Sequence, residues 1–313
     1  MLRTLAIAML LVALCGLAPA VFAQAALDYR LQARAVAPDV YVVEGAQADF
    51  APANGCNIIN TGFIVTGAGV VVVDTGPSKR YGEQLRVLIE RTTREAIVRV
   101  VHLNLHPDYF LGSQAFADVP RYATAITRAG MRREAAAYED NLYRLCGDWM
   151  KGTEALLPDH DAVPGSERIG RHELEWRELS GHTASDLVLI DRTAGVTFAG
   201  GLVFSARIPT TPHAELPAWQ QSLAWLAAHR TAVVVPSHGS LAVADAAIDG
   251  TQRYLAWIDG AFRRAAEQGL DMNDVLRLPV PAEFRQWAAF DTEYVRNVAH
   301  LYPRYEQAAL NSR

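Results

Sequence analysis

Residues 100–109 read VVHLNLHPDY, an apolar strand pattern that runs directly into polar side chains. The polar residues His102, Asn104, His106 and Asp108 recur at every second position. Because side chains of an extended chain alternate between two faces, these four can share one face. A strand end is also a rigid support on which side chains can converge on a metal ion. The segment therefore predicts a functional site at the carboxyl end of a buried strand.

Two further histidines also follow strand patterns. The sequence SGHT, at 180–183, comes after a strand pattern at 173–179, and PSHG, at 236–239, comes after the apolar run 232–235. Histidine and carboxylate are ordinary zinc ligands, and about four of them complete a site. A single histidine is more often structural, but histidines at three strand ends, one of them beside a carboxylate, predict a metal site. The four candidate ligands are His106, Asp108, His182 and His238.

The pattern around these segments interleaves strands with helices. The apolar run 70–73 ends at the turn residues DTGP, and Ser78 after them is a suitable N-cap for a helix. Strand patterns cover 40–43, 57–66, 70–73, 97–101, 173–179, 186–190, 196–199 and 232–235, and helical patterns cover 78–94, 110–117, 129–146, 217–229 and most of 243–306. Such interleaving favours an α/β sandwich with its helices outside. Neither a linker-like stretch nor an internal repeat interrupts 24–313, so we expect a single domain there.

The composition excludes several classes of protein. The chain has 313 residues, of which 50% are hydrophobic and 20% charged, so it is long and apolar enough to bury a full core. Its formal net charge is −5, and its basic runs are no longer than two residues. A mildly acidic chain of this kind has no global electrostatic attraction for nucleic acid. The composition therefore predicts no nucleic-acid partner. The predicted metal site instead indicates a small-molecule substrate.

The first 23 residues have the features of a secretory signal. Arg3 precedes an apolar core at 5–14, and the sequence VFA at 21–23 matches a cleavage site before Gln24. The alternative is a retained membrane anchor. Cleavage at this position would give a periplasmic protein without a membrane span.

Export changes the interpretation of the cysteines. Cys15 is lost with the signal, whereas Cys56 and Cys146 remain in the mature chain. In an oxidising compartment the two form either one disulfide or two buried free thiols. Without a C-x-x-C motif, a thiol oxidoreductase is weakly supported.

Five segments, in this order, resemble the metallo-β-lactamase superfamily. They are DTG at 74–76, residues 104–109 at the place of the H-x-H-x-D-H motif, GHT at 181–183, FAGG at 198–201 at the place of F-x-G-D, and PSHG at 236–239. The resemblance covers nearly all of the mature chain. It implies a four-layered αββα sandwich, here with a helical C-terminal extension, and metal-dependent hydrolysis.

The closer resemblance is to exported proteins called quinoprotein relay system zinc metallohydrolases. It is carried by NTGFIV at 60–65, VVVDTGPSKRYGE at 71–83, HPDYFLGSQAF at 106–116, SGHTASDLVLID at 180–191 and HLYPRYE at 300–306. The family name implies a link to periplasmic quinoprotein dehydrogenases that use pyrroloquinoline quinone (PQQ).

Three residues depart from the ligand set that the resemblance implies. Asn104 stands at the place of the first histidine, Tyr109 at that of a second-site histidine, and Gly201 at that of the bridging carboxylate. An amide oxygen and a phenol are weak zinc ligands, and glycine offers none. We therefore expect no dinuclear centre but a single zinc per chain, held by the four candidate ligands above with Asn104 and Tyr109 as weaker ones.

Three other residues belong to the neighbourhood of this site. His102 lies about 6.6 Å along the strand from Asn104, too far to replace it as a ligand. We expect His102 to pack behind the site and Asp74 to hold the ligand-bearing loops. His213 either points into the cleft or is a surface loop histidine.

Two functions follow from these observations. In the first, a mononuclear zinc hydrolase attacks an ester, lactone, amide or thioester, and Asp108 and His106 are the catalytic residues. In the second, catalysis has been lost, and the protein binds a quinone cofactor or assists a quinoprotein dehydrogenase.

Overall fold

The computed structural model describes residues 27–241 and 244–311. The predicted signal segment lies outside these residues. Three sheets are present in the described chain, and their strand bounds follow. The first contains β1 Arg34–Ala37, β2 Val40–Val43, β3 Thr61–Val65, β4 Val70–Val73, β5 Ile97–Val101, β6 Arg121–Ala123 and β7 His160–Asp161, in that order. The second contains β13 Val233–Val235, β11 Val196–Phe198, β10 Asp186–Asp191, β9 His172–Leu179 and β8 Gly165–Ile169, and a short third pairs β12 Phe204–Ser205 with β14 His238–Gly239.

Strand β4 shows why the first sheet is covered on both faces. It runs between antiparallel β3 and parallel β5, and its four valines are fully buried. Val71 and Val73 pack against the second sheet, whereas Val70 and Val72 pack under helix α1 (Lys79–Thr92). The hydroxyl of Ser78 caps this helix by accepting a hydrogen bond from the Tyr81 amide at 3.1 Å. Because successive side chains of a strand point to opposite faces, the valines of β4 pack into two hydrophobic layers, one on each side of the first sheet.

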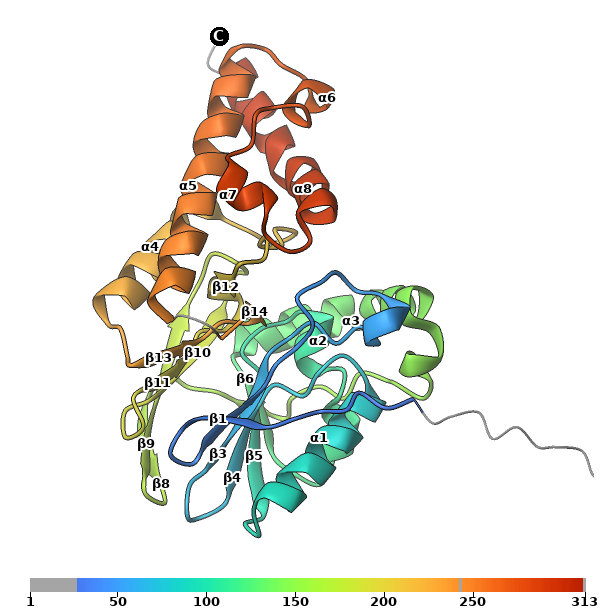
Figure 1. The fold of residues 1–313 in the computed structure, drawn as a ribbon, viewed down its shortest axis with the longest axis vertical. Helices are drawn as coiled ribbons and strands as arrows, with labels where there is room; N and C mark the ends of the chain where they lie inside the picture. Colours follow the sequence, from blue (N-terminus) through green and yellow to red (C-terminus); the bar gives the residue numbers. More distant parts are fainter. Residues whose placement is uncertain (1–26, 242–243, 312–313) are drawn as a thin grey trace, which may run out of the picture.

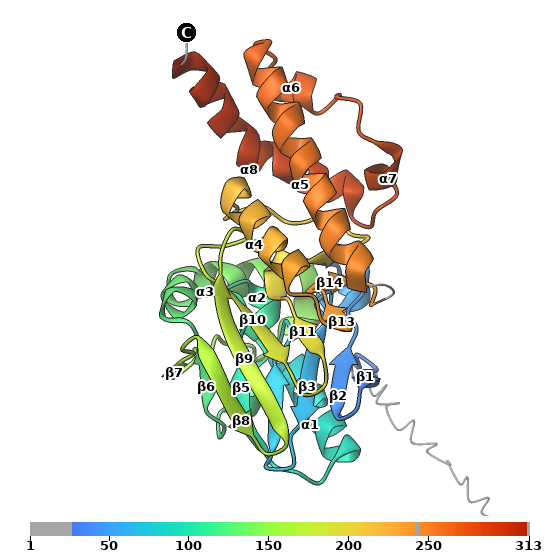
Figure 2. The ribbon, with the colours of Figure 1, turned by 90° about the vertical axis from the view of Figure 1, so that its left-hand side faces the viewer.

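The second sheet is likewise covered on both faces, by the first sheet on one side and by helices on the other. Leu187 and Leu189 of β10 face the first sheet, whereas Val188 and Ile190 face helices α4 (Leu216–Ala228) and α5 (Ala244–Glu267). The molecule is thus layered helix, sheet, sheet, helix, as Figures 1 and 2 show. The α/β sandwich expected from the sequence is confirmed.

The C-terminal helices form an arm beyond the sandwich. Long helices α5 and α8 (Phe290–Asn311) pack together, with the short helices α6 (Met272–Val275) and α7 (Ala282–Arg285) between them in sequence. Both views show this arm projecting away from the sheets (Figures 1 and 2). The described helices include none that is long and apolar enough to cross a membrane.

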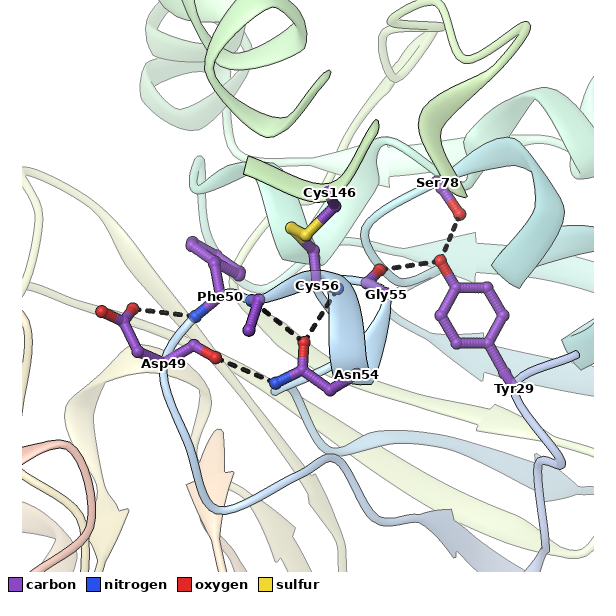
Figure 3. The surroundings of a disulfide bond; sticks show 9 residues. Tyr29, Asp49, Phe50, Asn54, Gly55, Cys56, Ser78 and Cys146 are labelled. Atoms are coloured by element: carbon purple, nitrogen blue, oxygen red, sulfur yellow. Dashed lines mark hydrogen bonds between the residues drawn. A yellow bond between two sulfur atoms is a disulfide. The ribbon is translucent and has the colours of Figure 1, made fainter. Parts of the chain in front are cut away.

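A disulfide joins Cys56 to Cys146, so the free-thiol alternative is wrong. The bond ties the loop before β3 to the last residue of helix α3 (Ala125–Cys146), and both cysteines are buried. Hydrogen bonds hold the same loop (Figure 3): the side-chain oxygen of Asn54 accepts from the Cys56 amide at 2.9 Å, and the Tyr29 hydroxyl donates to the Gly55 carbonyl at 2.8 Å. The loop is therefore fixed against α3.

Some element boundaries differ from the sequence patterns. The strand predicted at 57–66 begins only at Thr61, because Ile59 instead makes an isolated bridge to His238. The helix predicted at 110–117 is split into α2 (Pro107–Phe110) and a 3₁₀ turn (Ser113–Phe116) around Gly112. The Gly112 amide donates to the Gly76 carbonyl at 3.0 Å instead of to a helical carbonyl, and a Cβ at this position would lie 2.0 Å from the Thr75 carbonyl oxygen, so the contact requires glycine. Several strands of two to five residues were missed: β1, β6, β7, β8, β12 and β14.

Candidate functional site

The predicted site residues gather at one edge of the two sheets. The carboxyl end of β5 leads through 102–106 into α2, the β9–β10 turn brings His182, and β14 brings His238. A pocket of about 370 Å³ lies over His106, Asp108 and His238. Its walls come from the loop before β3, helix α3, residues 207–213 and helix α8. The structure thus brings the predicted residues together, and the sequence did not indicate that α3 and α8 supply walls of the pocket over them.

Asn104 links two loops by hydrogen bonds. Its amide nitrogen donates to Asp186 at 2.6 Å and lies 3.3 Å from Nδ1 of His182, while its oxygen accepts from the His106 amide at 3.1 Å. Asp186 also accepts from the amides of His182 and Thr183, at 3.0 and 2.9 Å. All of these polar groups are buried, so each hydrogen bond avoids a desolvation penalty. The oxygen of Asn104 is thus engaged within the protein.

His106 contacts two other histidines. Its Nε2 lies 3.0 Å from Nδ1 of His213, and its ring centroid lies 4.8 Å from that of His182. Burial lowers the pKa of His106 well below 6.5, and the neighbouring imidazoles lower it further. The ring is therefore neutral at neutral pH. Of the two alternatives for His213, the structure shows it pointing to His106 in the cleft.

His182 fills the space beside Gly201. A Cβ on Gly201 would lie 2.0 Å from Nδ1 of His182 and 2.9 Å from the amide nitrogen of Asn104. The His182 ring itself packs on Trp219 and Phe204, with centroids 4.9 and 5.6 Å away. Its Nε2 lies 3.2 Å from the Thr210 hydroxyl oxygen. The imidazole therefore occupies the space that a carboxylate at position 201 would need.

His238 and Asp108 are hydrogen-bonded to each other. Nε2 of His238 lies 2.8 Å from a carboxylate oxygen of Asp108, and Nδ1 lies 2.8 Å from the Ser237 hydroxyl. Burial lowers the pKa of His238, although Asp108 opposes this shift, so the ring is neutral at neutral pH. A neutral ring next to a carboxylate carries its proton on Nε2, and Nδ1 then accepts from Ser237. Both ring nitrogens are thus engaged.

Two aromatic rings contact the candidate histidines. Tyr109 contacts the rings of His106 and His238, at centroid distances of 6.5 and 6.2 Å. Phe204 contacts the ring of His182 at 5.6 Å and stacks on His238 at 5.0 Å, because β12 and β14 pair Phe204 with His238 in register. Burial, reinforced by Asp108, raises the pKa of the Tyr109 phenol well above 10. The phenol therefore stays protonated, which makes it a poor metal ligand.

The donor set does not fit the zinc site that the resemblance implies. Asp108 pairs with His238, His106 pairs with His213, and the Tyr109 and Phe204 rings contact the candidate histidines. Among residues 27–241 and 244–311, no three histidine, cysteine or acidic side chains form a group that could hold a metal ion. A zinc site needs four converging protein donors when it is structural and three when it is catalytic, with water as the fourth ligand.

His102 and Asp74 lie behind the site. Nδ1 of His102 lies 3.1 Å from the Tyr109 carbonyl oxygen, and its Nε2 lies 3.1 Å from the Ser113 hydroxyl, so the ring faces α2 and the turn after it. Asp74 accepts a hydrogen bond from the Leu103 amide at 2.9 Å. Burial lowers the pKa of His102 to about 3 and raises that of Asp74 well above its usual value. Both side chains thus support the segment that carries the site.

Sequence reasoning missed Asp186 and the charged residues of the pocket walls. Asp186 begins β10 and is followed by four apolar residues, and a single carboxylate directly before an apolar strand run can indicate a side chain that anchors the preceding loop. Arg207 and Glu293 lie 86 positions apart, and no pattern connects them.

Comparisons with known proteins agree on the fold. The family model of the metallo-β-lactamase superfamily matches residues 54–238. A solved metallo-β-lactamase from Pontibacter korlensis is 24% identical with a TM-score of 0.57, over 72% of this chain and 99% of that one. Metallo-β-lactamase IND-7 is 20% identical with a TM-score of 0.59, over 72% and 98%. TMB-1 is 17% identical with a TM-score of 0.55, over 73% and 98%. No curated protein matches the chain.

Proposed function

The chain belongs to the metallo-β-lactamase superfamily, a family of metal-dependent hydrolases, and from this premise we propose that it is a binding protein built on the hydrolase scaffold. Its ligand is a quinone cofactor, and its partner is an exported quinoprotein dehydrogenase. The observation that carries this proposal is that candidate metal ligands are engaged with one another or with a neighbouring histidine, His238 with Asp108 and His106 with His213. Zinc is typical of the superfamily, but here the candidate ligands engage one another.

The pocket supports binding of a small molecule. Its volume of about 370 Å³ lies in the range of small-molecule sites. Apolar side chains such as Phe50, Ile58 and Pro212 line it together with arginines and histidines. Such a mixture suits a planar, polar ring system, which a quinone cofactor such as PQQ provides.

Two observations support an extracytoplasmic location. The first 23 residues match a secretory signal, and the mature chain carries a disulfide. Disulfides persist chiefly in oxidising compartments such as the periplasm. Both observations support a periplasmic location, where quinoprotein dehydrogenases would be the partners.

The second candidate is the mononuclear zinc hydrolase. The contacts of His106 with His182 and His213, at ring-centroid distances of 4.8 and 5.3 Å, favour it, because imidazoles are ordinary zinc ligands. It requires side-chain rearrangement, since Nε2 of His182 faces Thr210 and His238 is bound to Asp108. This requirement ranks it second.

Metal content and quinone binding together test the proposal. Mature protein is purified from the periplasm without an affinity tag, its metals are measured by plasma mass spectrometry, and PQQ binding is followed by calorimetry in EDTA. We expect far less than one zinc per chain and measurable binding of PQQ. About one zinc per chain, lost in His106→Ala and His238→Ala, would instead establish the hydrolase candidate. Absence of PQQ binding would overturn the quinone ligand.

A further inference from the structure

The charges of the pocket wall on the α8 side are balanced within the protein. Arg207 is fully buried, and its guanidinium lies 3.3 Å from the Glu293 carboxylate. Arg296 lies 3.0 Å from Glu293 and 2.9 Å from Asp49. Two arginines thus face two carboxylates. This wall has no surplus positive charge with which to attract an anion.

The α3 wall is different. Tyr138, Asn141 and Arg144 lie on successive turns of α3, and all three line the pocket. Arg144 donates to the side-chain oxygen of Asn141 at 2.7 Å, and within the described chain it forms no ion pair with a carboxylate. Because the Asn141 oxygen is engaged, its NH₂ group remains as a donor. The guanidinium of Arg144 therefore keeps an unbalanced positive charge.

Tyr138 adds a second, independent observation. Its hydroxyl is buried, and no described residue forms a hydrogen bond with it. Burial, with a smaller effect of Glu134, raises the pKa of Tyr138, so the hydroxyl stays a donor. Glu134 itself pairs with Arg133 at 2.8 Å. A buried polar group without a partner costs free energy, which a ligand oxygen in the pocket would remove.

We propose that the α3 wall is a carboxylate-binding subsite, in which Arg144 binds the carboxylate of an organic acid and Tyr138 and Asn141 donate further hydrogen bonds to it. An arginine fork matches a carboxylate with two parallel hydrogen bonds. Asp108 lines the same pocket but is already hydrogen-bonded to His238, so the uncompensated charge of Arg144 is the feature that favours a carboxylate at α3. This subsite rests on the proposed function, in which a quinone cofactor binds in the pocket. It narrows the ligand class to aromatic carboxylates.

The disulfide holds this wall in position. Cys146 follows Arg144 by two residues and is bonded to Cys56, whose loop carries Phe50 and Ile58 on the facing side of the same pocket. The two walls are therefore covalently joined next to the subsite. A site with fixed walls loses less entropy when a ligand binds.

Calorimetry with two probes tests the subsite on mature, disulfide-bonded protein in EDTA. The first probe is benzene-1,3,5-tricarboxylate, and the second is PQQ. Arg144→Gln is compared with Arg132→Gln, which removes the same charge from an exposed position of α3 outside the pocket. We expect Arg144→Gln to weaken tricarboxylate binding about ten- to a hundredfold, and Tyr138→Phe about three- to tenfold. Arg132→Gln should bind like the wild type, and Arg144→Lys should fall between wild type and Arg144→Gln.

The outcomes separate the subsite from the quinone proposal. Equal tricarboxylate affinity in Arg144→Gln and Arg132→Gln, or no tricarboxylate binding by the wild type, overturns the subsite. PQQ binding that is insensitive to Arg144→Gln also overturns it, while the quinone ligand stands. Arg144-dependent binding of the tricarboxylate without PQQ binding supports the subsite and overturns the quinone ligand. Thermal melts of each variant verify that it is folded.

Discussion

Removing the Cys56–Cys146 disulfide is expected to destabilise the protein by a large fraction of its total stability. The bond closes a loop of 90 residues, and the chain-entropy relation for such a loop gives about 4–5 kcal/mol. A typical domain has a free energy of unfolding of about 5–15 kcal/mol. The double variant Cys56→Ala/Cys146→Ala removes the bond without leaving free thiols. Because both cysteines are buried, alanine also loses some packing in the same direction.

Urea unfolding, followed by far-UV circular dichroism and tryptophan fluorescence, measures this effect. The double variant should lose about 4–5 kcal/mol, which corresponds to a fall in Tm of about 8–20 °C. The slope of unfolding free energy against urea should rise, since the unfolded chain without a cross-link exposes more surface. Wild-type protein incubated with dithiothreitol is measured beside the variant, and we expect slow reduction because the disulfide is buried. A loss below about 1 kcal/mol would refute the argument that this loop closure constrains the unfolded chain.

Two further predictions concern the site and its surroundings. Gly201→Ala should lower the unfolding free energy by about 1–3 kcal/mol in a urea titration, because its Cβ would lie 2.0 Å from the packed His182 ring, and an unchanged midpoint would contradict that contact. The second is a loss of stability in acid: since the pKa of folded His102 is about 3 and that of an unfolded histidine about 6.5, the unfolded chain binds more protons in this window. From His102 alone the loss should be about 2 kcal/mol at pH 5 relative to pH 8, and His102→Gln should flatten that part of the pH profile.

The fold could be predicted from the sequence to the extent that its signals are local. The run of valines in β4, the turn after it and the Ser78 cap each have a clear pattern, and the structure has all three. The long helix α3 begins at Ala125 rather than at 129, because Thr124 caps it through a hydrogen bond from the Thr127 amide. Strands of two residues, such as β12 and β14, are too short to show the alternation of apolar and polar residues that identifies a strand in a sequence. They form only because distant segments meet, which no window of sequence reveals.

The sequence predicted which candidate residues lie near one another but not which contacts they make. Strand ends identify His106, His182 and His238 as neighbours, and the structure brings them to one edge. Which aromatic ring contacts which histidine depends on how distant strands are aligned in the folded chain. Phe204 stacks on His238 because two-residue strands pair them across 34 positions. The Arg207–Glu293 pair likewise depends on how the C-terminal arm packs on the sandwich.

The arrangement of polar groups leads to a last prediction, on zinc itself. A metal bound in a buried site satisfies imidazoles and carboxylates that would otherwise lack partners. Here Asn104 binds Asp186, His106 binds His213, and His238 binds Asp108, so these buried donors and acceptors already have partners. A metal would have to break those hydrogen bonds before it gained ligands.

Zinc should therefore change the stability of this protein very little. A ligand at a hundred times its Kd stabilises the folded state by about 2.7 kcal/mol, whereas a ligand that does not bind leaves the melting temperature unchanged. We expect melting temperatures in micromolar zinc and in EDTA to agree within about 1 °C for wild type, well below the shift that such binding gives. A zinc-dependent rise of several degrees, abolished by His106→Ala, would show that the paired histidines exchange their hydrogen bonds for a metal. That result would restore the hydrolase as the better explanation of the site.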